Sequence, residues 1–256
     1  MRAIWIVILG CGASAPKPGI EHVGELTPPV KSNYCPSRLL GAWVGELFPA
    51  CTPPQYMIAA PLCMGSVCGQ PCQVTSSGYG GAMGRDRYDH VLAIGYDQQG
   101  RYVSTTGGGL PPTTCSYEGD RLSSCKSDDH VASVERDARG RITAYRHGGE
   151  SEAVRYDEQG RVVAVGDHEL KYDERGWVSH DADEEIAHDE TGHVLRIGRG
   201  EDATVFEYDR ERLIRSKGPR SFNASFAYDA RGRVTRIRTG GFEAAGSTQF
   251  VYECGP

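Results

Sequence analysis

Residues 156–162 read Tyr-Asp-Glu-Gln-Gly-Arg-Val (YDEQGRV), and copies of this stretch decide the fold of the chain. The pattern returns as YDQQGRY at 96–102, YDERGWV at 172–178 and YDARGRV at 228–234. An acidic residue, a glycine and an arginine at fixed spacing are compatible with a ligand-binding loop and also with a turn. The residue types around them distinguish the two.

The stretch has the residue preferences of a β-hairpin. Asp157 opens it and Gly160 stands fourth, which favours a type I turn followed by a glycine at positive φ in a three-residue loop. Asp157 then lies opposite Arg161 on one face, and Tyr156 lies opposite Val162 on the other. An opposite-charge pair and an aromatic–β-branched pair across strands each contribute about 0.2–1 kcal/mol.

Two shorter copies test this hairpin model. YEGDRL at 117–122 and YDRERL at 208–213 lack one loop residue. A two-residue loop keeps Tyr117 opposite Leu122 and Tyr208 opposite Leu213, so both faces of the hairpin survive the deletion. Arg210 is the unfavourable feature, because a tight primed turn prefers Gly or Asn. We interpret the pattern as a hairpin framework rather than a ligand loop.

The hairpins form a long repeat with a strand-like rhythm. The anchor position recurs every 16 to 24 residues and is usually preceded, two residues earlier, by an apolar side chain, as expected of strands with one buried face. The anchors are Tyr96, Tyr117, Arg136, Tyr156, Tyr172, His188, Tyr208, Tyr228 and Tyr252. The complete framework copies are Tyr96, Asp97, Gly100 and Arg101; Tyr156, Asp157, Gly160 and Arg161; and Tyr228, Asp229, Gly232 and Arg233.

The repeat resembles the YD repeats of the RHS family. Trp177 and His193 replace the arginine in two of the copies. The resemblance implies hairpins joined into one continuous antiparallel sheet that spirals. Eight hairpins supply about sixteen strands, more than a flat sheet tolerates. We therefore predict an all-β fold: a curled, open antiparallel sheet of repeated hairpins over residues 85–256, preceded by a small disulfide-rich module at 34–84.

The N-terminal residues MRAIWIVILGC resemble a bacterial lipoprotein signal. The resemblance implies a signal peptide at 1–10, cleavage before Cys11 and lipidation of that cysteine. Residues 11–33 are rich in Pro and Gly, as expected of a flexible tether. These features predict a protein of the bacterial cell envelope whose lipid anchor holds it to a membrane, at the periplasmic face or the cell surface. The alternative is an ordinary N-terminus with a misassigned start.

The cysteine count agrees with export. Of nine cysteines, eight remain once Cys11 carries the lipid, and an even set in an exported chain favours disulfides. The candidates are Cys35, Cys51, Cys63, Cys68, Cys72, Cys115, Cys125 and Cys254. We expect Cys115 to pair with Cys125 across the Tyr117 hairpin and Cys254 to bond back to the 34–84 module. Zinc is the alternative for the crowded 63–72 stretch, although it has no C-x-x-C pair.

The densest group of ionisable residues runs from His180 to His193. Asp181, Asp183, His188 and His193 are candidate metal ligands by residue type. However, His188 and His193 occupy the tyrosine and arginine positions of an ordinary repeat, and no twelve-residue calcium loop is present. We therefore predict no metal site, no cofactor and no catalytic residue.

Charge and family resemblance bound the function. The formal net charge is −6 and no basic stripe occurs, which argues against a nucleic-acid partner. The leading hypothesis is a non-enzymatic binding or structural module, with carbohydrate or cell-surface ligands suggested by the resemblance. The second is a protein-interaction scaffold that uses free sheet edges. The third, least favoured, is a metal-dependent enzyme.

Overall fold

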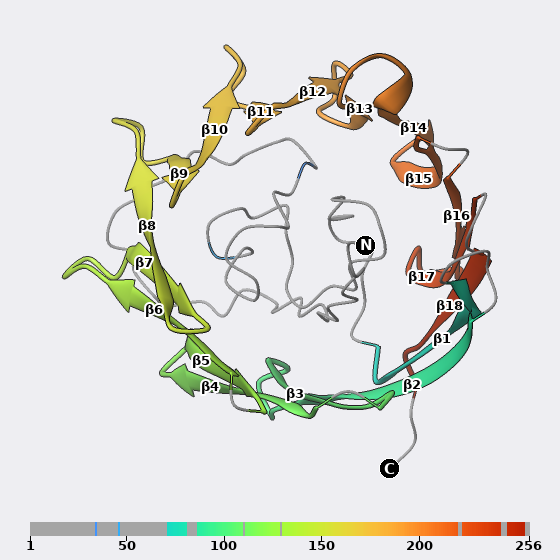
Figure 1. Ribbon diagram of the computed structural model, residues 1–256, viewed down its shortest axis with the longest axis horizontal. Coiled ribbons are helices and arrows are strands. Elements are labelled where there is room, and N and C mark those ends of the chain that lie inside the picture. Colours follow the sequence, from blue (N-terminus) through green and yellow to red (C-terminus); the bar gives the residue numbers. More distant parts are fainter. Residues whose placement is uncertain are drawn as a thin grey trace.

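A computed structural model describes residues 34, 46, 71–80, 86–109, 111–128, 130–219, 222–241 and 245–253. Eighteen β-strands form one antiparallel sheet that runs as a ring (Figure 1). The strands are β1 (Gln73–Gly80), β2 (Asp86–Tyr96), β3 (Tyr102–Gly107), β4 (Thr113–Glu118), β5 (Arg121–Ser127), β6 (His130–Arg136), β7 (Ile142–His147), β8 (Glu150–Tyr156), β9 (Val162–Val165), β10 (His168–Tyr172), β11 (Val178–Asp181), β12 (Glu184–His188), β13 (Val194–Ile197), β14 (Thr204–Asp209), β15 (Arg212–Lys217), β16 (Asn223–Tyr228), β17 (Val234–Gly240) and β18 (Ala245–Val251). A short 3₁₀ helix, η4 (Gly200–Asp202), connects β13 to β14. The described part of the chain contains no helix long and apolar enough to cross a membrane.

The sheet is closed, which corrects the prediction of an open curled sheet. Each strand pairs with its neighbours in sequence, and β1 pairs with both β2 and β18. The β1–β18 register runs from Gln73↔Val251 to Tyr79↔Ala245. Closure leaves none of the described strands with an unpaired edge. The hypothesis of edge-strand addition requires a free strand edge, and none of the described strands offers one.

A repeated β-bulge gives the sheet its curvature. In the hairpin of β8 and β9, Tyr156 pairs with Val162 and Arg155 pairs with Ala164, so Val163 is an extra residue. The same shift lies between the anchor and the residue before it in all eight described hairpins from β2–β3 to β16–β17. A bulge bends its strand and increases the local twist. Eight copies at one place in the repeat bend the sheet consistently, and the turn residues alone do not predict these bulges.

The ring closes through a hairpin unit that is split between two ends of the repeat tract. β18, which is followed directly by the anchor Tyr252, takes the place of the first strand of this hairpin. β1 takes the place of its second strand, and no turn connects the two. Residues 73–80, which the sequence analysis places in the 34–84 module, are thus the first strand of the sheet. We call β1 and β18 the seam.

The seam is packed closely on its core side. Val74 is fully buried, and Ser76 Oγ lies 3.0 Å from Thr248 Oγ1 in a buried hydrogen bond. Gly78 lies opposite both Gly246 and Tyr88. A Cβ at Gly78 would come within 2.3 Å of the Ala245 carbonyl oxygen and 2.6 Å of the Tyr88 hydroxyl. Glycine is required here because the backbones and the tyrosine leave no room for a side chain.

The apolar core lines the inner side of the ring. One cluster includes Ile142, Val194 and Leu213, all fully buried, and a second surrounds Val74 and Leu92. Tyr34, which precedes the strands, is 2% exposed and belongs to the first cluster. The wall is therefore packed on its inner face, and its outer face carries the alternating polar side chains.

Several sequence expectations concern residues outside the described part. They are the lipidation of Cys11, the 1–10 and 11–33 segments, and the pairing of Cys35, Cys51, Cys63, Cys68 and Cys254. Cys115 and Cys125 form the expected disulfide across the β4–β5 hairpin, and Cys72 is disulfide-bonded as well.

Candidate functional site

The loop after each anchor, which we call the YD turn, is built by its aspartate. In the copy at 156–162 the Gly160 amide donates to the Asp157 carbonyl at 3.0 Å, the Asp157 amide donates to the Arg161 carbonyl at 2.9 Å, and Gly160 has φ 79°. The Asp157 carboxylate accepts from the Arg161 amide at 2.8 Å and from Arg161 Nε at 2.7 Å. Burial alone raises the pKa of Asp157, but these hydrogen bonds outweigh it and the pKa is lowered. The framework residues therefore stabilise the turn.

The anchor tyrosines connect one hairpin to the next. Backbone pairing between β7 and β8 runs only from Ala144↔Ala153 to His147↔Glu150, so these strands are not paired near the YD turns. There the Tyr156 hydroxyl donates to the Ile142 carbonyl at 2.7 Å. Burial raises the pKa of Tyr156 to about 12, so the hydroxyl stays protonated even at alkaline pH.

This bond recurs around the ring and forms what we call the tyrosine ladder. The hydroxyls of Tyr117, Tyr172, Tyr208, Tyr228 and Tyr252 donate to the carbonyls of Tyr102, Val162, Val194, Leu213 and Val234, at 2.6–3.0 Å. Tyr96, at the end of β2, donates to the carbonyl of Pro71, just before β1, at 3.2 Å, which continues the ladder to the split unit. The ladder explains why the repeat favours a phenol at the anchor, a reason that hairpin geometry alone does not give.

Five of the turn arginines also contact the next anchor tyrosine. The Arg161 guanidinium lies 4.4 Å from the centre of the Tyr172 ring while its Nε holds Asp157. The same cation–π contact joins Arg101 to Tyr117, Arg141 to Tyr156, Arg212 to Tyr228 and Arg233 to Tyr252, at 4.3–5.6 Å. Each contact contributes about 0.5–1 kcal/mol at a partly exposed site. Asp, Arg and Tyr therefore act as one unit that spans two hairpins.

The deviating repeats keep these contacts with other side chains. Trp177 stands at an arginine position and His188 at the next anchor, and their rings contact each other at 5.4 Å. His193, also at an arginine position, stacks on Tyr208 at 4.7 Å and lies 3.1 Å from Asp189. Burial lowers the pKa of His188 to about 4, so its ring is neutral at pH 7. In both places a ring–ring contact takes the place of the arginine–tyrosine contact.

Arg136 is the anchor that departs furthest from tyrosine. Its Nη2 donates to the Leu122 carbonyl at 3.2 Å, the bond a tyrosine would make, and Nη1 donates to the Gly140 carbonyl at 3.1 Å. The guanidinium also pairs with Glu46, with Nη2 2.9 Å from Oε2. The charge that Arg136 introduces is thus compensated by a residue that precedes the sheet.

The candidate metal ligands are not brought together. Asp181 is 6% exposed and its carboxylate accepts from the Tyr34 hydroxyl and contacts His168 Nε2. His188 lies against Trp177, and His193 lies between Asp189 and Glu211. Asp183 is exposed in the β11–β12 turn. Among the described residues no three His, Cys, Asp or Glu side chains are grouped to hold a metal.

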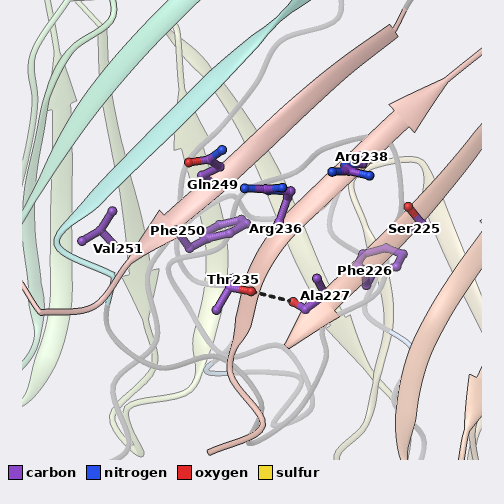
Figure 2. A pocket seen from close by; sticks show the side chains of 9 residues that line it. All are labelled: Ser225, Phe226, Ala227, Thr235, Arg236, Arg238, Gln249, Phe250 and Val251. Carbon is purple, nitrogen blue, oxygen red and sulfur yellow. Dashed lines mark hydrogen bonds between the residues drawn. The ribbon is translucent and has the colours of Figure 1, made fainter. Parts of the chain in front are cut away.

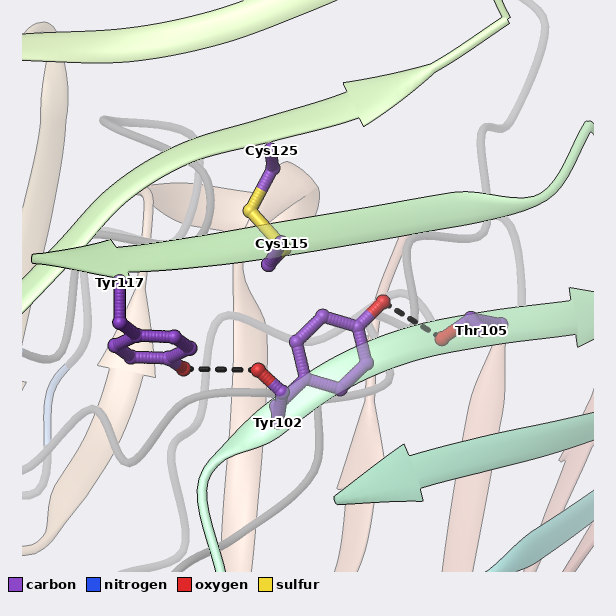
Figure 3. The surroundings of a disulfide bond; sticks show 5 residues. All are labelled: Tyr102, Thr105, Cys115, Tyr117 and Cys125. Atoms are coloured by element: carbon purple, nitrogen blue, oxygen red, sulfur yellow. Dashed lines mark hydrogen bonds between the residues drawn. A yellow bond between two sulfur atoms is a disulfide. The ribbon is translucent and has the colours of Figure 1, made fainter. Parts of the chain in front are cut away.

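The disulfide replaces an apolar contact on the core side of the wall. Cys115 stands two residues before the anchor Tyr117, where other repeats have an apolar side chain, and it is 8% exposed. Figure 3 shows its bond to Cys125 beside Tyr102, whose hydroxyl lies 2.7 Å from Thr105 Oγ1. The bond joins opposite residues of β4 and β5. It fastens one hairpin rather than two distant segments.

A hollow lies on the outer side of the wall. It has a volume of about 550 Å³ and lies over β16, β17 and β18. Figure 2 shows Arg236 between Gln249 and Arg238, with Thr235 on the same strand as the two arginines and Ser225 on β16. Sequence reasoning missed it because it treated arginines only as parts of YD turns. The strand register, which places both arginines on one face, was the available signal.

Comparison with known proteins identifies the repeat. Residues 123–253 match the family model described as Teneurin YD-shell. No curated protein sequence matches the chain. A porin-like protein from Bacteroides uniformis shares 10% identity at a TM-score of 0.42, over 72% of this chain and 98% of that one.

Two toxin structures are also similar. TcdB2–TccC3 shares 13% identity at a TM-score of 0.25, over 64% of this chain and 11% of that one. The Tc holotoxin pore of Photorhabdus luminescens shares 13% identity at a TM-score of 0.27, over 72% of this chain and 11% of that one. The chain thus spans about a tenth of those toxin chains. The family model covers just over half of the 256 residues, and the chain belongs to the Teneurin YD-shell family.

Proposed function

We propose that the protein is a non-enzymatic scaffold of the bacterial cell envelope, held to a membrane by a lipid on Cys11, that binds ligands on the outside of a closed YD shell. The closed wall is the observation that carries the proposal. The sheet closes through β1 and β18, and the inner face is occupied by the apolar clusters. The outer face is the side of the wall that remains for a partner.

The use made of the ionisable residues supports a scaffold. Asp157 and Arg161 hold a turn, Arg136 holds Glu46, and His193 packs on Tyr208. The side chains that looked like a site in the sequence are thus engaged in the wall. The Cys115–Cys125 disulfide is compatible with an oxidising compartment outside the cytoplasm.

Fatty-acid labelling tests the anchor. Bacteria that express the full chain are grown with an alkyne-tagged palmitate, and the wild type is compared with the Cys11→Ser variant. We expect label on the wild type alone, in the membrane fraction. An unlabelled wild-type protein in the cytosol would contradict the proposed location.

A binding screen tests the ligand class. The full-length Cys11→Ser variant, which keeps every shell residue, is applied to an array of neutral and acidic glycans. We expect saturable binding to a subset of the glycans. An array without binding, combined with specific capture of an envelope protein, would replace carbohydrate by a protein partner.

A further inference from the structure

The outer face of the shell pairs its charges in most sectors. Outward arginines and lysines on neighbouring strands face a glutamate, so positive charge is locally compensated. The pairs are Arg146 with Glu135, Arg155 with Glu169 at 3.7 Å, Arg199 with Glu185 at 2.7 Å, and Lys217 with Glu207 at 2.6 Å.

Two arginines on β17 have no such glutamate partner in the described part of the chain. Arg236 lies opposite Ala227 on β16 and Gln249 on β18, while Arg238 lies opposite Ser225 and Ser247. Within the described residues neither arginine makes an ion pair. Residues two apart on a strand point to the same face and lie about 7 Å apart, so the two guanidinium groups form one basic spot.

The spot coincides with the 550 Å³ hollow. Arg236 is half-buried and Arg238 is exposed, so one guanidinium forms part of the floor and the other stays accessible. Ser225, Thr235 and Gln249 add hydroxyl and amide groups around them (Figure 2). Phe226 and Phe250 alternate with these residues and pack against the two apolar clusters, which fixes the strands beneath the hollow.

We propose that this hollow binds an anionic glycan, with Arg236 and Arg238 holding a carboxylate or sulfate group and the neighbouring polar side chains holding sugar hydroxyls. Arginine presents donors in a fork that fits such planar or tetrahedral anions. Two uncompensated arginines are too few to follow a nucleic-acid backbone, and the net charge of −6 opposes a polyanion of that length. This inference rests on the proposed binding role and names its site and ligand class.

Titration calorimetry with defined oligosaccharides tests the site. The probes are an oligogalacturonate for carboxylate, a heparin-derived hexasaccharide for sulfate, and a neutral galacto-oligosaccharide of equal length. The full-length Cys11→Ser protein is compared with the same protein carrying Arg236→Gln and Arg238→Gln. The matched control carries Arg155→Gln and Arg196→Gln, which remove two outer-face arginines that have glutamate partners.

We expect at least one anionic probe to bind, the neutral probe not to bind, and the Arg236/Arg238 variant to lose affinity at least tenfold. The control should change less than twofold, and all proteins should have the same far-UV circular dichroism. Equal affinity of the Arg236/Arg238 variant would overturn the site, even where the array shows glycan binding. Tighter binding of an octaglutamate peptide or a single-stranded oligonucleotide than of either glycan would overturn the ligand class.

Discussion

Removing one hydroxyl of the tyrosine ladder tests how the hairpins are joined. Tyr156→Phe deletes the 2.7 Å bond to the Ile142 carbonyl and leaves that carbonyl without this donor, in a region where β7 and β8 are not paired. A net hydrogen bond contributes about 0.5–1.5 kcal/mol, and an unsatisfied buried acceptor costs about 1–3 kcal/mol. We expect the free energy of unfolding to fall by about 1–2 kcal/mol, since the ring and its contact with Arg141 are retained.

Equilibrium urea unfolding, followed by tryptophan fluorescence, provides the measurement. Trp177 is 5% exposed in the wall and reports on its integrity. Tyr79→Phe is the matched control, because Tyr79 is 53% exposed and lies outside the ladder. Its unfolding free energy should change by less than about 0.5 kcal/mol. If Tyr156→Phe changes stability no more than Tyr79→Phe does, the ladder does not join the hairpins.

Three further perturbations follow from the same geometry. Gly78→Ala should strongly lower the melting temperature measured by differential scanning calorimetry, because the new Cβ would lie 2.3 Å from the Ala245 carbonyl oxygen. Gly240→Ala is the control and should be nearly neutral, because the nearest atom to its Cβ is 3.5 Å away. Equal effects of the two substitutions would show that the seam can relax. Burial lowers the pKa of His188 in the folded protein to about 4, below its ordinary value of 6.5 in the unfolded chain. As the pH falls, the unfolded chain is protonated before the folded protein, so the stability present above pH 6.5 should be lost progressively as the pH falls toward 4. His188→Tyr should reduce this acid sensitivity in urea titrations at pH 7 and pH 5, and an unchanged difference between the two pH values would refute the assignment. Replacing both Cys115 and Cys125 by Ser should lower the free energy of unfolding by up to about 3 kcal/mol through loop entropy, and no loss in urea unfolding would show that the hairpin is closed without its bond.

The hairpin register was predictable from the sequence because it depends on local chemistry. Tyr117↔Leu122 and Tyr208↔Leu213 occur as expected in the two shorter copies, and the first turn residue Arg210 adopts φ 58° to allow it. Asp157 and Gly160 specify their turn within four residues. A turn of this kind can be deduced from one copy and tested on the others.

Closure was not predictable in the same way. It depends on pairing β1 with β18, which are far apart in sequence, and residues 73–80 carry no YD turn. Their many small residues, including Gly78, resemble a flexible hinge until the close packing under Tyr88 is known. The repeated bulge could not be predicted from the sequence either, because the extra residue has no constant type: it is Val163 in one hairpin and Ser123 and Thr235 in others.

The candidate site was missed for a related reason. In the sequence, Arg236 and Arg238 look like ordinary charged strand residues. Only the identity of the residues opposite them on the neighbouring strands shows that no carboxylate faces them. Those partners lie on β16 and β18, so the register of three strands must be known first. Conversely, the His180–His193 cluster looked like a site because its residues are close in sequence, but the hairpins point them at separate partners.

Hydrogen exchange at the seam tests the closed shell most directly. Mass spectrometry of the full chain can compare peptides from β1 and β18 with peptides from β14 and β15, which lie inside the repeat. If the ring is closed, β1 and β18 each pair with a strand on both sides, and the amides of Gln73–Gly80 and Ala245–Val251 should be protected as strongly as those of Thr204–Lys217. Exchange of either seam strand within seconds, with β14 and β15 still protected, would show an open sheet and contradict the account.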